Sequence, residues 1–269
     1  MLVFPNAKIN IGLNIVEKRA DGFHNIESCF YPVGWKDALE ITRTESFSVE
    51  FDGISIPGSE ADNICVKAYQ QLAADFDLPP VKIHLLKAIP IGAGLGGGSA
   101  DAAFTIKALN AFFDLNISFE KQLSYARRLG SDCAFFILNQ PAYCFGKGDE
   151  FEHIDIDLKG KWIVLVNPGI HISTVEAYSG IKPQKSEADL RALLGRPIET
   201  WKDLVKNDFE ATLFPKYTLL KEIKEELYKH GAQYASMSGS GSTIFGIFEQ
   251  EADLAGQFSQ FKVWQGTMG

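Results

Sequence analysis

The sequence predicts an α+β fold arranged in two domains. Apolar and polar side chains alternate over residues 7–15 and 81–86, which is the pattern of strands with one buried face. Apolar side chains recur three and four positions apart over residues 103–113 and 118–129, as they do on amphipathic helices. With 269 residues the chain is long enough for two hydrophobic cores, although one large domain is also possible.

The boundary between the domains is expected shortly after a polar turn, Gly-Lys-Gly-Asp, at residues 146–149. The apolar run at 162–168 then predicts a buried strand that opens the second domain. We therefore expect a catalytic domain at residues 1–157 and a C-terminal domain at residues 158–269.

Local signals predict the elements of the first domain. The strand at 7–15 puts Lys8 and Asn10 on one face, about 7 Å apart, and this face alone indicates a solvated surface. An Asp-Gly turn at 21–22 returns the chain into a hairpin partner at 24–30. The remaining early elements are two strands and a helix: residues 39–42, residues 47–51, and a helix capped by Asp62 or Asn63.

Further along, Ser118 and Gly130 mark the two ends of a helix. Asp132 opens the apolar run 133–138 and is typical of a helix N-cap. The second domain is expected to contain three helices and a strand that follows a second glycine-rich turn: residues 190–194, 201–205, 219–228, 243–248 and the turn at 238–242.

The segment between the strand at 81–86 and the helix at 103–113 is rich in glycine. Five of the 24 glycines lie within residues 92–98. A strand, a glycine loop and a helix start together turn backbone N–H groups and the helix dipole toward an anion. Glycine allows phosphate oxygens to reach those amides, so the segment indicates a phosphate-binding loop.

Other interpretations of this loop remain open. No Gly-Lys-Ser/Thr closes it, so it is not a Walker P-loop. Gly92, Gly94 and Gly97 do have the spacing of a dinucleotide-binding loop, but Asp114, at the distance of the required acidic residue, follows a helix and does not end a strand. A flexible turn is the plainest alternative.

Bulk composition narrows the class of protein. The net charge is −8 and no basic stripe is present, which disfavours nucleic-acid binding. No apolar run reaches membrane-spanning length, and the first residues lack a charged leader. The four cysteines are scattered and read as reduced thiols. We expect a cytoplasmic protein without a membrane or nucleic-acid partner; the sequence does not give its oligomeric state.

Four stretches resemble the motifs of the GHMP kinases, and together they run nearly end to end. They are PIGAGLGGGS at 90–99, PNAKIN at 5–10 continuing to DGFH at 21–24, LGSD at 129–132, and MSGSGS at 237–242. The resemblance implies a ribosomal protein S5-like N-terminal domain and a ferredoxin-like C-terminal domain. It also implies an enzyme that transfers the ATP γ-phosphoryl group with Mg²⁺, whose ligands the sequence does not identify.

The DGFH stretch resembles the members that phosphorylate the 2-hydroxyl of a cytidyl diphosphate ester of methylerythritol. The resemblance implies catalytic roles for Lys8, beside the transferred phosphoryl group, and Asp132, as proton acceptor. Here Ser131 replaces the family's usual alanine before that aspartate. ATP-binding roles are implied for Asn63 and for the loop residues Gly92, Ala93, Gly94, Leu95, Gly96, Gly97, Gly98, Ser99, Ala100, Asp101 and Ala102.

Substrate-binding roles are implied for Asn10, Phe23, His24, Thr174 and Tyr178. The family usually has tyrosine where this chain has Phe23, so stacking on the cytosine would survive while a hydroxyl contact would not. Each residue also has an ordinary interpretation: a surface histidine, a helix cap or a core aromatic side chain.

The sequence therefore leaves several hypotheses for the function open. A GHMP kinase acting on mevalonate or homoserine is the nearest alternative. A dinucleotide-binding oxidoreductase and a catalytically silent nucleotide-binding protein are more distant ones. Turnover on the different acceptors, or hydride exchange with NAD(P), separates these possibilities.

Overall fold

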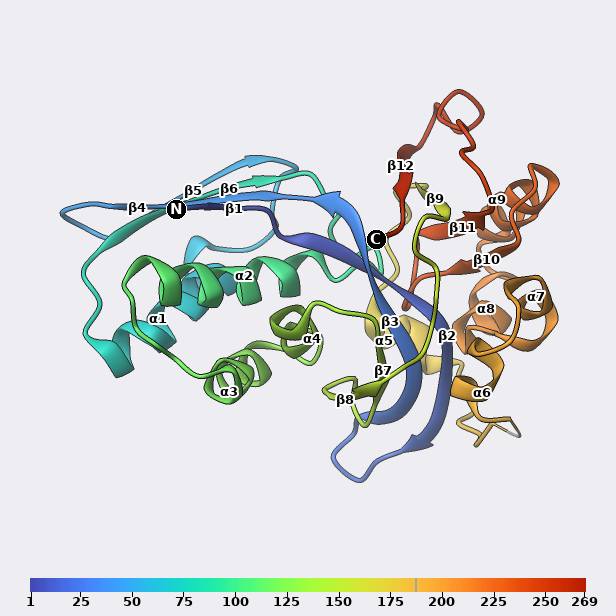
Figure 1. The fold of residues 1–269 in the computed structure, drawn as a ribbon, viewed down its shortest axis with the longest axis horizontal. Coiled ribbons are helices and arrows are strands. Elements are labelled where there is room, and N and C mark those ends of the chain that lie inside the picture. The colour runs from blue at the N-terminus through green and yellow to red at the C-terminus, as the bar shows by residue number, and fades with distance from the viewer. Residues whose placement is uncertain (187) are drawn as a thin grey trace. The chain divides into compact units, whose positions relative to one another are not determined.

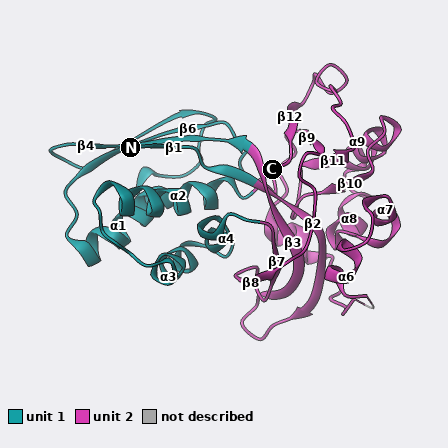
Figure 2. Ribbon diagram, viewed as in Figure 1, with its two compact units in different colours: residues 1–7, 35–91, 96–140 teal, residues 8–34, 92–95, 141–269 magenta. Residues whose placement is uncertain are grey.

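The computed structural model describes residues 1–186 and 188–269. The chain forms two compact units, which Figure 2 shows in different colours. Unit 1 comprises residues 1–7, 35–91 and 96–140, and unit 2 comprises residues 8–34, 92–95 and 141–269. The predicted division at residues 157 and 158 follows the chain, whereas these units also bring together segments that are far apart in it.

Unit 1 is a four-stranded sheet with helices on one face (Figure 1). Its strand order is β1-β4-β6-β5, with β4 antiparallel and β5 parallel to β6. The strands are β1 (Leu2–Val3), β4 (Ala38–Arg43), β5 (Ser48–Gly53) and β6 (Val81–Lys87). The helices are the short η1 (Glu60–Asp62), α1 (Ile64–Phe76), α2 (Gly97–Phe112), α3 (Phe119–Leu129) and α4 (Cys133–Leu138).

The elements predicted for this unit form where expected. On β6 the apolar residues Val81, Ile83 and Leu85 are fully buried, so the alternation does mark one core-facing side. The Asn63 side chain accepts a hydrogen bond from the Cys65 amide at 2.8 Å and caps α1. The Ser118 hydroxyl accepts one from the Lys121 amide and caps α3.

Unit 2 contains two four-stranded sheets. The first, in the order β2-β3-β7-β8, is made of β2 (Asn6–Lys18), β3 (His24–Lys36), β7 (Ala142–Phe145) and β8 (Glu150–His153). The first two residues of β2 and the last two residues of β3 belong to unit 1. The second, antiparallel and in the order β10-β11-β9-β12, is made of β9 (Trp162–Asn167), β10 (Tyr234–Met237), β11 (Ile244–Phe248) and β12 (Lys262–Thr267).

The helices of unit 2 complete its core. They are α5 (Thr174–Ser179), α6 (Leu190–Leu194), η2 (Ile198–Thr200), α7 (Trp201–Leu204), α8 (Asp208–Leu213) and α9 (Thr218–Lys229). Leu220, Ile223 and Leu227 of α9 pack in one cluster with Val164 of β9 and Ile244 of β11. Burial of these aliphatic side chains stabilises this part of unit 2.

Strand β2 differs from its prediction. Its residues from Asn6 to Leu13 are buried on both faces, not on one. Lys8 is only 3% exposed and Asn10 only 1%, so the polar face of the strand is not solvated. The sequence pattern shows which side chains share a face, but it does not show that another segment covers that face.

Candidate active site

The Lys8 ammonium group is held inside unit 2. Its Nζ donates to Asn10 Oδ1 at 2.6 Å and to the Gly94 carbonyl at 3.4 Å. It also lies 4.5 Å from the centre of the Phe30 ring, within cation–π range. Asn10 is fixed in turn because its Nδ2 donates to the Ser28 hydroxyl, which donates to the Gly12 carbonyl at 2.6 Å. The cation is therefore preorganised by neighbouring strands.

The two glycine-rich segments meet beside Lys8. The Ser238 hydroxyl donates to the Gly94 carbonyl at 2.8 Å and accepts from the Asn10 amide at 3.2 Å. A Cβ placed on Gly94 would lie 1.9 Å from the Ser238 carbonyl oxygen, so only glycine allows this approach. The second segment is thus part of the site and not merely a tight turn.

Asn207 holds the second glycine-rich segment in place by hydrogen bonds to its backbone. Its side-chain amide donates to the carbonyls of Met237 at 2.7 Å and Gly239 at 2.9 Å, and its Oδ1 caps α8 by accepting from the Phe209 amide. Neither Asn207 nor Ser28 was predicted from the sequence to belong to the site. The only local signal for Asn207 is that of an ordinary helix cap before Asp208-Phe209.

The first glycine-rich segment belongs partly to each unit. Residues 92–95 lie in unit 2, and Gly96 and the start of α2 lie in unit 1. Gly92, Gly94 and Gly96 have positive φ angles, and Gly96 precedes the first helical residue, Gly97. At Gly98 the φ angle is ordinary, and an added Cβ would meet nothing within 4 Å. The backbone of α2 is therefore open at Gly98, as an anion cradle requires.

Asp132 lies in unit 1 at the start of α4 and is half-buried. It occupies the predicted N-cap position, but its side chain makes no cap hydrogen bond and its backbone is already helical, with φ −76° and ψ −12°. The predicted capping role of the Asp132 side chain is therefore wrong. The Ser99 hydroxyl, in the first turn of α2, lies near the thiol of the next residue, Cys133.

The other predicted ATP-binding side chains have structural partners in unit 1. Asn63 caps α1, as described. Asp101 is 2% exposed and pairs with Lys87 at 2.9 Å, so its side chain points into the interior of the unit. Any contact of these two residues with nucleotide remains a prediction.

Two of the predicted substrate residues, His24 and Tyr178, form an aromatic pair in unit 2. The His24 and Tyr178 rings stack with centroids 4.5 Å apart, and Tyr178 meets Phe209 edge-on at 4.9 Å. Partial burial, together with the nearby Lys18, lowers the pKa of His24, which favours the neutral ring. Phe23 is 54% exposed, with Lys147 Nζ 5.2 Å from its ring centre. The rings of Phe23, His24 and Tyr178 are together called the aromatic edge below.

Thr174, the remaining predicted substrate residue, is exposed at the first position of α5. It is not the cap of that helix, because the Ser173 hydroxyl accepts from the Glu176 amide. Its predicted contact with substrate is therefore not replaced by a capping role.

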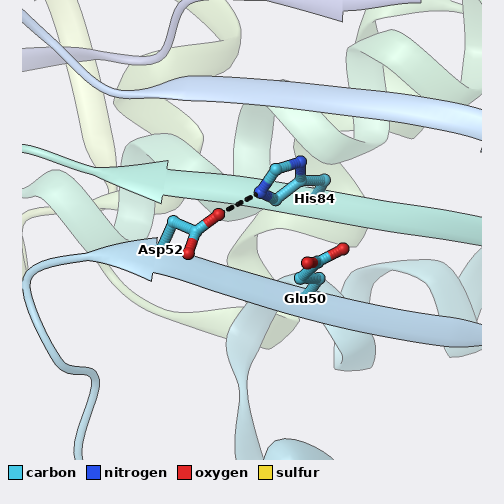
Figure 3. Close-up of side chains that lie close together, drawn as sticks. All are labelled: Glu50, Asp52 and His84. Atoms are coloured by element: carbon cyan, nitrogen blue, oxygen red, sulfur yellow. Dashed lines mark hydrogen bonds and ion pairs between the residues drawn. The ribbon is translucent and has the colours of Figure 1, made fainter.

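A separate cluster of ionisable side chains lies on the sheet of unit 1 (Figure 3). Glu50 and Asp52 on β5 face His84 on β6, and His84 Nε2 lies 2.7 Å from Asp52 Oδ2. Glu50 forms an ion pair with Lys82. Cross-strand ion pairs of this kind account for all three side chains on an exposed surface.

Two family comparisons cover more than half of the chain. The family described as "GHMP kinases N terminal domain" matches residues 63–147, and "GHMP kinases C terminal" matches residues 189–261. The chain belongs to the GHMP kinase family and is therefore a phosphotransferase. The predicted resemblance and the α+β GHMP kinase architecture are both confirmed.

Two relatives of high identity carry the same name. The chain is 51% identical to the 4-diphosphocytidyl-2-C-methyl-D-erythritol kinase of Cytophaga hutchinsonii, with 94% of each chain covered. It is 45% identical to the enzyme of that name from Parabacteroides distasonis, with both chains covered completely. A crystal structure of 4-(cytidine 5'-diphospho)-2C-methyl-D-erythritol kinase matches with 29% identity and a TM-score of 0.84, covering 100% of this chain and 99% of that one.

More distant structures share the fold alone. The mevalonate kinase of Methanococcus jannaschii matches with a TM-score of 0.72 at 16% identity. Among the described residues, no helix has both the length and the apolar character needed to cross a bilayer.

Proposed function

We propose that this chain transfers the γ-phosphoryl group of ATP to the 2-hydroxyl of 4-diphosphocytidyl-2-C-methyl-D-erythritol, a step of isoprenoid biosynthesis. The observation that carries the proposal is the buried Lys8 ammonium group held by Asn10 and Gly94 between two glycine-rich segments. Phosphoryl transfer depends mainly on alignment and charge stabilisation, and a fixed cation supplies both. The names of the relatives favour this acceptor over mevalonate and homoserine.

In this proposal each group has a separate task. The amides of the glycine-rich segment, from Gly92 to Ala102, hold the ATP phosphates, and Asn63 lies near the adenine. Lys8 stabilises the negative charge that develops on the transferred group. Asp132 accepts the proton of the attacking hydroxyl. Mg²⁺, when bound with the nucleotide, would neutralise part of the charge of the phosphates.

The substrate's cytidine end is assigned to the aromatic edge. Phe23 offers an exposed ring for stacking, and the neutral His24 ring offers both a donor and an acceptor. Asn10, Thr174 and Tyr178 complete the proposed substrate-binding set. The Tyr178 ring keeps His24 oriented by stacking on it.

The function is tested by measuring ATP consumption with three acceptors. The cytidyl substrate is expected to be phosphorylated at an enzyme's usual rate, of about 1–10³ s⁻¹, whereas mevalonate and homoserine are expected to give background turnover. Preferential turnover of either of those two acceptors would contradict the proposal. Mass spectrometry of the product locates the new phosphate.

The nucleotide site is tested separately by Gly98→Ala. The new methyl group meets no protein atom and adds helix propensity, so the fold should be retained. It would, however, occupy the space proposed for a phosphate, and we expect the Kd for ATP to rise at least about tenfold. Gly256→Ala, which also meets open space in a turn of unit 2, is the matched control and should leave the Kd unchanged.

A further inference from the structure

Three ionisable side chains lie buried together in unit 1, at the base of α2. Asp37, Lys87 and Asp101 are 1%, 3% and 2% exposed. Lys87 Nζ bonds with Asp37 Oδ2 and lies 2.9 Å from Asp101 Oδ2. Asp37 Oδ1 accepts from the amides of Ala88 at 2.6 Å and Ile89 at 2.8 Å.

The triad joins the two ends of the glycine-rich segment. Lys87 is the last residue of β6, and Ala88 and Ile89 begin the segment. Asp101 is the fifth residue of α2, into which the segment leads. A Cβ on Gly97 would lie 2.8 Å from Lys87 Nζ and 2.9 Å from Ile89 Cγ2, so the first helical residue packs directly against this group.

Stability alone does not explain a buried triad of ionisable side chains. Replacing buried ion pairs by apolar groups is often neutral or stabilising, because desolvation opposes the attraction between the charges. Within the described residues, Asp101 Oδ1 has no hydrogen-bond partner, which adds a further cost. The arrangement does, however, fix a geometry that apolar packing would leave less specific.

We propose that Asp37, Lys87 and Asp101 are positioning residues that hold the first turn of α2 in register with the end of β6. This inference rests on the proposed function, in which amides of that turn hold the ATP phosphates. A displacement of about 1 Å at such a site can reduce the rate by about 10²-fold. The side chains of Asp37, Lys87 and Asp101 are almost completely buried, so in this proposal they act through the backbone that they fix.

The test is Lys87→Met, which keeps the length of the side chain and removes the ammonium group. We expect kcat/KM for ATP to fall about 10- to 100-fold and the Kd for ATP to rise in parallel. The KM for the cytidyl acceptor should stay within about twofold, since its proposed contacts do not involve α2. An unchanged Kd and KM for ATP in Lys87→Met would overturn the proposal.

A second pair of variants keeps the inference testable if Lys87→Met does not fold. Asp101→Asn retains an oxygen that accepts from Lys87, and it should bind ATP within about threefold of the wild type. Asp101→Ala removes that oxygen and should reproduce the defect of Lys87→Met. Equal ATP affinity in the two Asp101 variants would show that the contact does not position the loop.

The matched control is Tyr125→Phe in the same unit. It removes the hydrogen bond from Tyr125 of α3 to Asp75 of α1, and it should lower the free energy of unfolding without changing the KM for ATP. If it raises that KM as Lys87→Met does, the triad acts only through stability. If Lys87→Met leaves the Kd for ATP unchanged while Gly98→Ala raises it, the positioning role is wrong and the proposed nucleotide site stands. If Gly98→Ala also leaves the Kd for ATP unchanged, the proposed nucleotide site itself is wrong.

Discussion

Lys8 is surrounded by partners that fix its position before substrate binds. Asn10 Oδ1, the Gly94 carbonyl and the Phe30 ring approach its ammonium group from different segments of unit 2. A preorganised donor of this kind typically contributes ~2.7–4 kcal/mol to transition-state stabilisation, because no reorganisation is needed during the reaction. We assign that contribution to Lys8 in the proposed reaction.

Asp132→Asn tests the proposed proton acceptor. Asparagine has nearly the same shape but cannot accept the hydroxyl proton, so kcat is expected to fall by roughly 10²–10⁴-fold while the Kd for ATP stays unchanged. Steady-state kinetics and calorimetry measure the two quantities. Near wild-type turnover would remove Asp132 from the mechanism.

Phe23→Ala tests the aromatic edge. Stacking of a base on an aromatic ring contributes ~1–3 kcal/mol, so the KM for the cytidyl substrate should rise about 5- to 150-fold with little change in kcat. Phe23→Tyr should retain the stacking. Phe119→Ala, at another exposed phenylalanine in unit 1, should leave the KM unchanged; a similar rise there would argue for a general effect of surface substitution.

The sequence predicts candidate reactive side chains, but it does not predict what surrounds them. Alternation placed Lys8 and Asn10 on one face of a strand, but Ser238, which bonds with Asn10, lies 228 residues further along the chain. Local patterns carry no information about such distant contacts. For the same reason Ser28 and Asn207, whose roles are entirely tertiary, went unrecognised.

Among the secondary-structure elements, the strongly periodic ones were predicted best. Strand β6 and helices α1, α2, α3 and α9 follow their hydrophobic patterns, and α1 and α3 also begin at their predicted cap residues. Several elements of unit 2 were not predicted, among them β7, β8, β10, β12, α5 and α8. Strand β12 carries a weak alternation interrupted by Gly266 and is specified by pairing with β9, and α8 has only six residues. Short or edge elements depend on tertiary contacts more than on their own propensity.

The contact between Lys87 at the end of β6 and Asp101 of α2 predicts that the free energy of unfolding depends on pH. Burial raises the pKa of Asp101 to about 8, with Asp37 adding to the rise and Lys87 opposing it. The folded protein therefore holds a proton that the unfolded chain releases near its ordinary value of 3.8, so the contribution of Asp101 to stability falls as the pH rises from about 4 to about 8.

Urea unfolding of the wild type and Asp101→Asn at several values between pH ~5 and ~8 measures this effect. Because asparagine does not titrate, the wild type should lose stability relative to the variant as the pH rises. If the difference in free energy of unfolding between the two proteins stays constant, or changes in the opposite direction, the pKa of Asp101 is not raised.

At the scale of the whole molecule, the compact units cut across the order of the chain. Residues 8–34 and 92–95 belong with the C-terminal part of the sequence in unit 2. The sequence analysis placed its boundary at residues 157 and 158 from a polar turn and a change of pattern. Such signals mark where a chain leaves one unit, but they do not show an earlier segment joining a later one.

The whole molecule should be resistant to thiol reagents. All four cysteines, which lie in both units, are completely buried and free of disulfide bonds, and burial raises the pKa of Cys133 to about 12. A thiolate is the reactive form, so the native protein should react with a disulfide reagent very slowly. In urea all four thiols should react. Rapid labelling of the native protein would indicate an opened core.

Synthesis on the ribosome makes the buried state of Lys8 a late event. The lysine emerges among the first residues, but Ser238, which closes the hydrogen-bonded network around Asn10 and Gly94, follows Asn10 by 228 positions. At about 5–20 residues per second, roughly 10 to 50 seconds separate the two. During that interval a nascent chain carries an uncovered cation and an incomplete strand partner, and it is then that we expect a chaperone to be most useful.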